Sequence, residues 1–124
     1  MAAHKPEEVN PCLIEAINNG DVESALAMYE TGAAFVTEEG TVTGSEAIRM
    51  VMESFIALKP KISIVAKETV QAGDIAVTRG NWSLTGTGPE GEALDMAGQS
   101  VEVVRRQADG TWLFVIDLPN GAED

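Results

Sequence analysis

Alternating hydrophobic and polar residues dominate the second half of the chain, and this period of two is typical of β-strands. The alternation begins at Lys61 and continues to a turn signal at 72–74. Three longer segments follow, separated by turn signals at 88–91 and 108–110: GDIAVTRGNWSLTGTG, EALDMAGQSVEVVRRQADG and TWLFVIDLPNG. A strand of about a dozen residues spans roughly 40 Å, so a sheet made of such strands has to twist and curl. We predict an antiparallel meander with bends or bulges at its internal glycines, Gly80, Gly86 and Gly98.

The beginning of the chain shows helical spacing instead. Apolar residues recur at helical intervals from Val9 to Ile17, and Pro11 either begins this helix or bends a longer one. A short second helix, with Tyr29 on its apolar face, is expected to close at Gly32. These two segments predict a pair of packing helices ahead of the sheet.

A hairpin and the clearest helix of the chain come next. Residues 33–43 read as two short strands joined by a turn. A helix then starts at 44–45 and stops at Pro60. Its apolar stripe, which must face the sheet, consists of Ile48, Val51, Met52, Phe55 and Leu58. Helices at the start and a curved antiparallel sheet at the end predict an α+β fold.

The composition fits one soluble domain over residues 1–124, with flexible tails at 1–5 and 120–124. The chain is 44% hydrophobic, and no apolar run approaches the ~20 residues of a membrane span. Its net charge of -12 argues against nucleic acid and against anionic membrane as partners, because both require basic side chains. The charged N-terminal segment does not resemble a signal peptide, so we expect a cytoplasmic protein.

The inventory of reactive side chains is short. Cys12 is the single cysteine, which excludes an internal disulfide, and the only histidine, His4, lies in the expected tail. A histidine base or a histidine-containing metal site is therefore not expected. We expect neither a metal nor a cofactor, and any acid–base catalyst has to be a carboxylate.

Apolar residues point to both faces of the predicted strands. There are too many apolar residues for one face of the sheet to be exposed to solvent, so we expect a homodimer formed through the sheet. The residues concerned are Trp82, Leu84, Val101, Val103 and Val104.

Several segments together resemble a known superfamily. They are AINNGDVESALAMYE, the AAFV hairpin with TG before SEAIRMV, GDIAVTRGNW, and SVEVVRRQADGTWLFVIDLPNG. From about Pro11 to Asn120 the chain is similar to nuclear transport factor 2-like proteins, in particular the ketosteroid isomerase-like and SnoaL-like polyketide cyclase branch. The resemblance implies a cone-shaped, cystatin-like roll, in which a strongly bent sheet wraps around a long helix and leaves a pocket. It implies no single activity, because members isomerise, cyclise, dehydrate, hydrolyse or merely bind small molecules.

The steroid isomerases in this group use a carboxylate base and hydrogen-bond donors, and these positions can be compared with the chain. The base position corresponds to Thr37, with Glu38 beside it. The tyrosine donor of the first helix corresponds to Leu13, which cannot donate. The acidic donor falls within 99–102. The resemblance therefore does not carry the usual isomerase set.

Asp117 is the strongest candidate acid, with Glu38 as a second candidate. Asp117 ends the apolar run Trp112–Ile116, where burial would raise its pKa. Alternatively, it is a structural residue that bonds to backbone or pairs with Arg79 or Arg105. Glu102 is expected in a surface ion-pair network with Arg105 and Arg106.

The expected pocket is several hundred Å3 in volume and mainly apolar. Gln99 faces the opposite side of its strand from Ser100 and Glu102, so only one of these sets can face the pocket. Trp82 is either a pocket wall or part of the core or dimer interface. The candidate pocket residues are Phe35, Thr37, Met52, Phe55, Trp82 and Gln99.

Three functions remain open from the sequence. The first is cofactor-free acid–base chemistry on a small apolar molecule, of the isomerase, cyclase or dehydratase kind. The second is a non-catalytic module for ligand binding or dimerisation. The third is a structural domain, which would require side chains to fill the cone completely.

Overall fold

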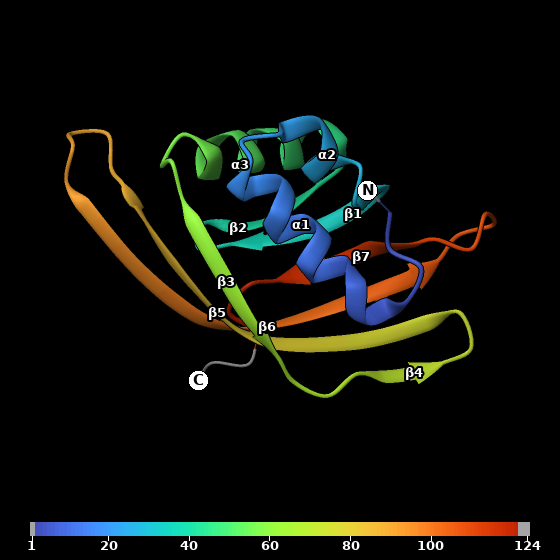
Figure 1. The fold of residues 1–124 in the computed structure, drawn as a ribbon. Coiled ribbons are helices and arrows are strands. Elements are labelled where there is room, and N and C mark those ends of the chain that lie inside the picture. Colours follow the sequence, from blue (N-terminus) through green and yellow to red (C-terminus); the bar gives the residue numbers. More distant parts are fainter. Residues whose placement is uncertain (1, 122–124) are drawn as a thin grey trace.

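One mixed sheet of seven strands bends around the helices in the computed structural model, which describes residues 2–121 (Figure 1). The strand order is β2-β1-β7-β6-β5-β3, and β4 pairs with β5. The parallel pairing of β1 with β7 makes the sheet mixed, since the other pairs are antiparallel. The strands are β1 Tyr29–Thr37, β2 Gly40–Thr43, β3 Lys61–Ala66, β4 Val70–Ala72, β5 Ile75–Thr87, β6 Ala93–Arg106 and β7 Trp112–Leu118.

Two helices, not one, occupy the concave side of this sheet. Helix α1 runs across it beside β3, and α3 packs on β1 and β2, with the short α2 between the two helices (Figure 1). The helical bounds are η1 Pro6–Glu8, α1 Val9–Asn18, α2 Val22–Leu26 and α3 Ser45–Ile56. The arrangement confirms the predicted α+β cone with a curved, unclosed sheet.

The core lies where these layers meet. Ile48 and Met52, from the predicted stripe of α3, are fully buried, as are Val104 and Phe114 from the concave face of the sheet. Burying one such side chain contributes roughly 1.5–3 kcal/mol. The apolar side chains that recur every three to four residues on α3 therefore pack against the inward-facing side chains of β6 and β7 in one apolar layer.

The predicted helix boundaries need two corrections. Pro11 neither begins nor bends its helix: it is the third residue of α1, in the first turn, where its missing N–H is not needed. Tyr29 does not lie on a helix, because α2 ends at Leu26 and Tyr29 opens β1. Strand β1 is therefore longer than the predicted hairpin arm and runs through Gly32.

The expected N-terminal tail is anchored over the part that is described. Ala3 is buried, and its carbonyl oxygen accepts a hydrogen bond of 2.9 Å from the backbone N–H of Trp112. At the other end, the N–H of Gly121 bonds to the carbonyl of Leu118 at 3.0 Å. Met1 and residues 122–124 of the two predicted tails lie outside the described residues.

The internal glycines allow close approach and do not form bulges. A Cβ on Gly98 would lie 2.7 Å from the Trp82 ring, and one on Gly80 would lie 2.7 Å from Ile64 Cδ1. A Cβ on Gly86 would lie 2.7 Å from the carbonyl oxygen of Leu58. The irregularity of the β6–β7 pairing falls between Val103 and Val104 instead. The glycines thus determine which side chains can lie against the strands.

No helix within residues 2–121 is long and apolar enough to cross a membrane.

Candidate functional site

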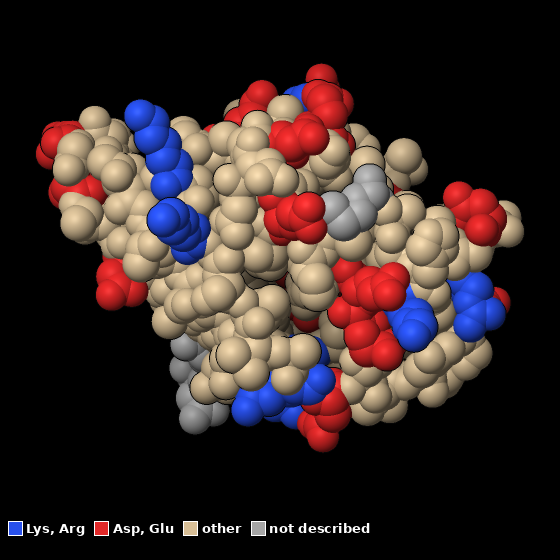
Figure 2. All heavy atoms as spheres, viewed as in Figure 1, with Lys and Arg blue, Asp and Glu red and all other residues tan. Residues whose placement is uncertain are grey.

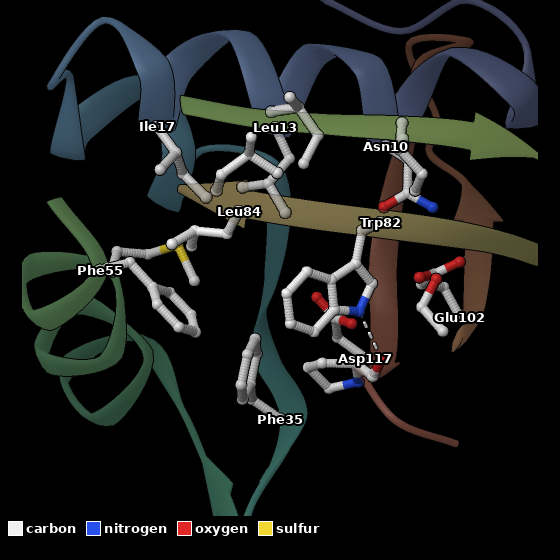
Figure 3. A pocket seen from close by; sticks show the side chains of 15 residues that line it. Asn10, Leu13, Ile17, Phe35, Phe55, Trp82, Leu84, Glu102 and Asp117 are labelled. Carbon is white, nitrogen blue, oxygen red and sulfur yellow. Dashed lines mark hydrogen bonds between the residues drawn. The ribbon is translucent and has the colours of Figure 1, made fainter. Parts of the chain in front are cut away.

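A cavity of about 80 Å3 lies between α1, α3 and the concave face of the sheet (Figure 3). Its half-exposed lining residues, such as Ile14 and Trp82, connect it to the surface. It is much smaller than the expected several hundred Å3, because large side chains from both helices and from the sheet project into it. Side chains nevertheless do not fill the cone. The lining comprises Asn10, Leu13, Ile14, Ile17, Phe35, Met52, Phe55, Ile62, Ile64, Trp82, Leu84, Ser100, Glu102, Asp117 and Pro119.

Asp117 is buried in this apolar lining with only 5% of its surface exposed. Its Oδ2 accepts a hydrogen bond of 2.6 Å from the hydroxyl of Tyr29. Burial, followed by the nearby charge of Glu102, raises the pKa of Asp117 to about 7, although the hydrogen bond from Tyr29 acts in the opposite direction. Asp117 can therefore exist in either protonation state near neutral pH.

The Tyr29 hydroxyl remains a proton donor under the same conditions. Its ring is buried and lies against Phe114, with 4.8 Å between ring centroids. Burial, followed by the charge of Asp117, raises the pKa of Tyr29 well above its usual range. Tyr29 thus orients the Asp117 carboxyl and does not compete with it for ionisation.

Glu102 is the second buried acid, and its predicted place in a surface ion-pair network is wrong. It is 1% exposed, and its Oε1 accepts a hydrogen bond of 2.7 Å from Thr78. Burial raises the pKa of Glu102, while hydrogen bonding with Ser100, Thr78 and Asn10 acts in the opposite direction.

The two arginines that were expected to pair with Glu102 lie on the surface. On the face of the molecule drawn in Figure 2, basic and acidic side chains lie next to one another in several places. Arg105 pairs with Glu30 at 2.8 Å, and Arg106 pairs with Asp74 at 3.2 Å. Neither arginine pairs with Asp117, and Arg79 pairs with Glu68. The alternation along β6 places Glu102 on the concave face, away from these exposed partners.

The two acids lie side by side on the concave face of neighbouring strands. Glu102 and Asp117 are directly paired residues of β6 and β7. Within residues 2–121, no Lys, Arg or His lines the cavity. When two carboxyl groups are neighbours in an apolar site, ionisation of one disfavours ionisation of the other. One acid can therefore donate a proton while the other accepts one.

Trp82 forms a wall beside the acids (Figure 3). Its indole Nε1 donates a hydrogen bond of 2.7 Å to the carbonyl of Pro119. Gly98 pairs with Trp82 across β5 and β6, which lets the ring lie over the backbone. The polar edge of the indole is thereby satisfied, and its apolar surface remains for the cavity.

The structure brings five of the predicted site residues to the cavity: Phe35, Met52, Phe55, Trp82 and Asp117. Ser100 and Glu102 also line it, which decides the orientation of their strand.

Three predicted site residues do not line this cavity. Thr37 lies at the end of β1, and its hydroxyl donates to the carbonyl of Gly40 at 2.8 Å. Glu38 follows it in the hairpin turn. Gln99 is exposed and lies by a polar hollow on the other face of β6, next to Arg79 and Asn81. Local turn geometry and strand alternation place all three away from Asp117.

Three polar residues of the site were not predicted from the sequence: Asn10, Tyr29 and Thr78. Ser100, by contrast, belongs with Glu102 to one of the two sets that strand alternation left open. The pairing of Tyr29 with Asp117 spans 88 residues and depends on the register between β1 and β7, which leaves no local signal.

The geometry limits which chemistry the site can support. Leu13 lines the cavity where the isomerase comparison places a tyrosine, and it has no donor. No three side chains of the metal-ligating types come together within residues 2–121. The reactive groups of the cavity are therefore its two carboxyls and the hydroxyls and amide around them.

Solved structures share this architecture at low sequence identity. A ketosteroid isomerase-like protein from Erwinia carotovora atroseptica is 21% identical, with a TM-score of 0.80 and coverage of 90% of this chain and 89% of that one. A nuclear transport factor 2-like superfamily protein from Salmonella enterica is 16% identical, with a TM-score of 0.80 and coverage of 90% and 84%. A conserved protein from Planctomyces limnophilus is 21% identical, with a TM-score of 0.81 and coverage of 90% and 89%. These similarities show the fold.

No curated protein sequence matches the chain. The profile of the SnoaL-like domain, however, matches residues 13–115, which include the second half of α1, all of α3 and most of the sheet. With the bent sheet and the cavity on its concave face, this match shows that the chain belongs to the SnoaL-like family, in the nuclear transport factor 2-like superfamily.

Proposed function

We propose that the cavity binds a small, largely apolar molecule and that Asp117 exchanges a proton with it, without a cofactor. Members of the superfamily are often isomerases, cyclases or dehydratases, and they commonly bind small hydrophobic ligands. The observation that carries the proposal is the position of Asp117. It is a 5% exposed carboxyl with a pKa of about 7 that lines an apolar cavity.

The proton transfer would use both states of this carboxyl. A general acid or base is most effective when its pKa lies near the working pH. Protonated Asp117 can donate to a carbonyl oxygen, and ionised Asp117 can remove a proton from the adjacent carbon. Tyr29 holds the carboxyl in place, and Glu102 favours its protonated state.

An assay with a simple model ketone tests this proposal without knowledge of the natural substrate. Cyclopentanone presents a carbonyl group on a compact apolar ring, part of which the cavity can enclose, and exchange of its α-protons for deuterium can be followed by NMR in D2O. Wild-type protein is expected to accelerate the exchange, and Asp117→Asn should reduce the acceleration by about 10²–10⁴-fold. Asp95→Asn is the matched control, because Asp95 is an exposed acid on β6. Equal rates for wild type and Asp117→Asn would remove Asp117 from the mechanism.

A non-catalytic binding module is the second candidate, and two observations favour it. The hydrogen bond from Tyr29 gives Asp117 a structural partner, and Leu13 supplies no donor for a developing oxyanion. In this case the purified protein should carry a small apolar molecule that native mass spectrometry detects. Cyclopentanone would then bind without faster exchange.

We further propose that the protein forms a homodimer through the convex face of the sheet. An apolar row crosses three strands there, because Val77 pairs with Val103 and Val103 pairs with Ile116. Ile116 is 37% exposed. Val103→Asp should convert a dimer to a monomer in analytical ultracentrifugation, whereas Asn81→Asp, on the same face of β5, should leave it intact. A wild-type monomer would contradict the proposal.

A further inference from the structure

The cavity contains negative charge without positive charge. Glu102 and Asp117 line it, and no basic side chain of residues 2–121 does. The surface arginines Arg79, Arg105 and Arg106 form their ion pairs with other acids. A buried carboxylate without a cationic partner is costly, so this lining favours keeping a proton on the pair of acids.

One oxygen of Asp117 also lacks a donor. Tyr29 bonds to Oδ2, whereas no hydrogen bond from residues 2–121 reaches Oδ1. No unpaired side-chain oxygen or nitrogen in this part of the chain is fully sealed within the protein. Since Asp117 is 95% buried and lines the cavity, Oδ1 faces the open space of the cavity. This acceptor oxygen is available to a ligand.

From this geometry we infer that the ligand carries a cationic nitrogen, such as an alkylammonium group, which lies against Asp117 and Glu102. The inference rests on the proposed binding function and names the charge of the ligand's polar end. An ammonium group would donate to Oδ1 and supply the positive charge that the lining lacks.

The rest of the lining suits the other parts of such a ligand. The Trp82 ring lies beside Asp117 in Figure 3 and offers an aromatic face to a cation. Leu13, Phe35 and Phe55 surround the remaining space with apolar surface. A cavity of about 150 Å3 holds benzene, so one of about 80 Å3 encloses only part of a ring of that size, and the rest would lie toward the half-exposed residues Ile14 and Trp82.

A cation and a neutral ligand should respond to pH in opposite directions. A cation favours ionised Asp117, so its binding should strengthen as pH rises through about 7. A neutral ligand that accepts a proton from Asp117 should bind more weakly over the same range. Two other titratable groups lie near Asp117: Glu102 on β6, whose ionisation also favours a cation, and Tyr29 on β1, whose raised pKa keeps it neutral over this range. The lining residues from α1, α3, β3 and β5 carry no titratable side chain.

Isothermal titration calorimetry with cyclopentylamine and cyclopentanol tests the inference. These probes have nearly the same shape, and an alkyl amine stays protonated below about pH 9. The ionised fraction of Asp117 rises from about one-eleventh at pH 6 to about ten-elevenths at pH 8. Cyclopentylamine should therefore bind about tenfold more tightly at pH 8 and release protons at pH 7, which buffers of different ionisation enthalpy reveal.

Two variants assign the effect to the cavity. Asp117→Asn should abolish the pH dependence and the proton release, whereas Asp95→Asn, which removes the same charge from the surface, should retain both. If circular dichroism shows that Asp117→Asn does not fold, Glu102→Gln is titrated in its place. That variant should weaken cyclopentylamine more than cyclopentanol, because it removes only the second negative charge.

The outcomes separate this inference from the proposed function. The inference of a cationic ligand is overturned if cyclopentanol binds at least as tightly as cyclopentylamine, or if binding of the amine does not strengthen as pH rises. Either result leaves an apolar binding site. Failure of both probes and of cyclopentanone to bind overturns the inference and the proposed function together. Cyclopentylamine binding that persists unchanged in Asp117→Asn places the cation elsewhere and also overturns the inference.

Discussion

The two faces of β6 differ sharply although their residues alternate along one strand. Ser100, Glu102 and Val104 face the helices and are at most 3% exposed, whereas Gln99 and Arg105 on the other face are exposed. Glu102 thus becomes a buried acid of the cavity, while Asp95, seven residues earlier on the same strand, stays exposed. The chemistry of an acid in this protein depends on the face of the sheet to which it points.

Truncation of a concave-face residue should give the largest contrast between the faces. Phe114 is fully buried, so Phe114→Ala should lower the free energy of unfolding by about 3–5 kcal/mol. Ile116→Ala, on the convex face of the same strand, should lower the free energy of unfolding of the monomer much less. Urea denaturation of both variants measures the difference, and similar losses would show that the convex face is also core.

The pH dependence of stability should distinguish the buried acid from the exposed one. The folded protein retains the Asp117 proton up to about pH 7, whereas the unfolded chain releases it near pH 3.8. The folded state therefore binds more protons between these values, and this carboxyl destabilises the fold increasingly as pH rises from about 4 to 7. The full contribution is roughly 4 kcal/mol and is constant above that range.

Asp117→Asn removes this contribution. Relative to wild type, the variant should become more stable by up to roughly 4 kcal/mol on going from pH 4 to pH 8. Asp95→Asn should show no such trend. The measurement is urea denaturation at a series of pH values, and parallel curves for wild type and Asp117→Asn would mean that Asp117 is ionised throughout.

Gly98 tests how the cavity wall is supported. A Cβ at this position would collide with the Trp82 ring and with Asn120 Oδ1, so Gly98→Ala should cost about 1–3 kcal/mol and displace the indole. Gly32→Ala is the control, because no heavy atom lies within 4 Å of a Cβ there. Trp82 fluorescence in a Trp112→Phe background reports the displacement, and an unchanged spectrum would contradict it.

The smallest effect is expected on the exposed side. Arg105 pairs with Glu30 at 2.8 Å, but its side chain is 46% exposed, and exposed ion pairs contribute little. Arg105→Ala should leave the thermal midpoint nearly unchanged, in contrast to Glu102→Ala, which would leave the Thr78 hydroxyl without its buried acceptor. Equal shifts in the midpoint would contradict this ranking.

The comparison also shows why the sequence predicted some site residues and not others. Phe35, Met52, Phe55 and Trp82 were found because apolar spacing on a helix or strand indicates an inward direction, and the cone has one interior. Asp117 was found because it follows a strongly apolar strand. Thr37, Glu38 and Gln99 were chosen by alignment or by strand position, which does not determine where a side chain points.

By itself, the sequence determined most of the elements and the curvature of the sheet, because hydrophobic period, turn residues and strand length are local properties of the chain. The family followed from the resemblance of several whole segments. Tertiary structure decided the chemistry of the cavity. The parallel pairing of β1 with β7 brings Tyr29 to Asp117, and the β6–β7 register sets Glu102 beside the same carboxyl. Burial and mutual charge, which raise the pKa of Asp117 to about 7, arise only from this assembly of distant residues.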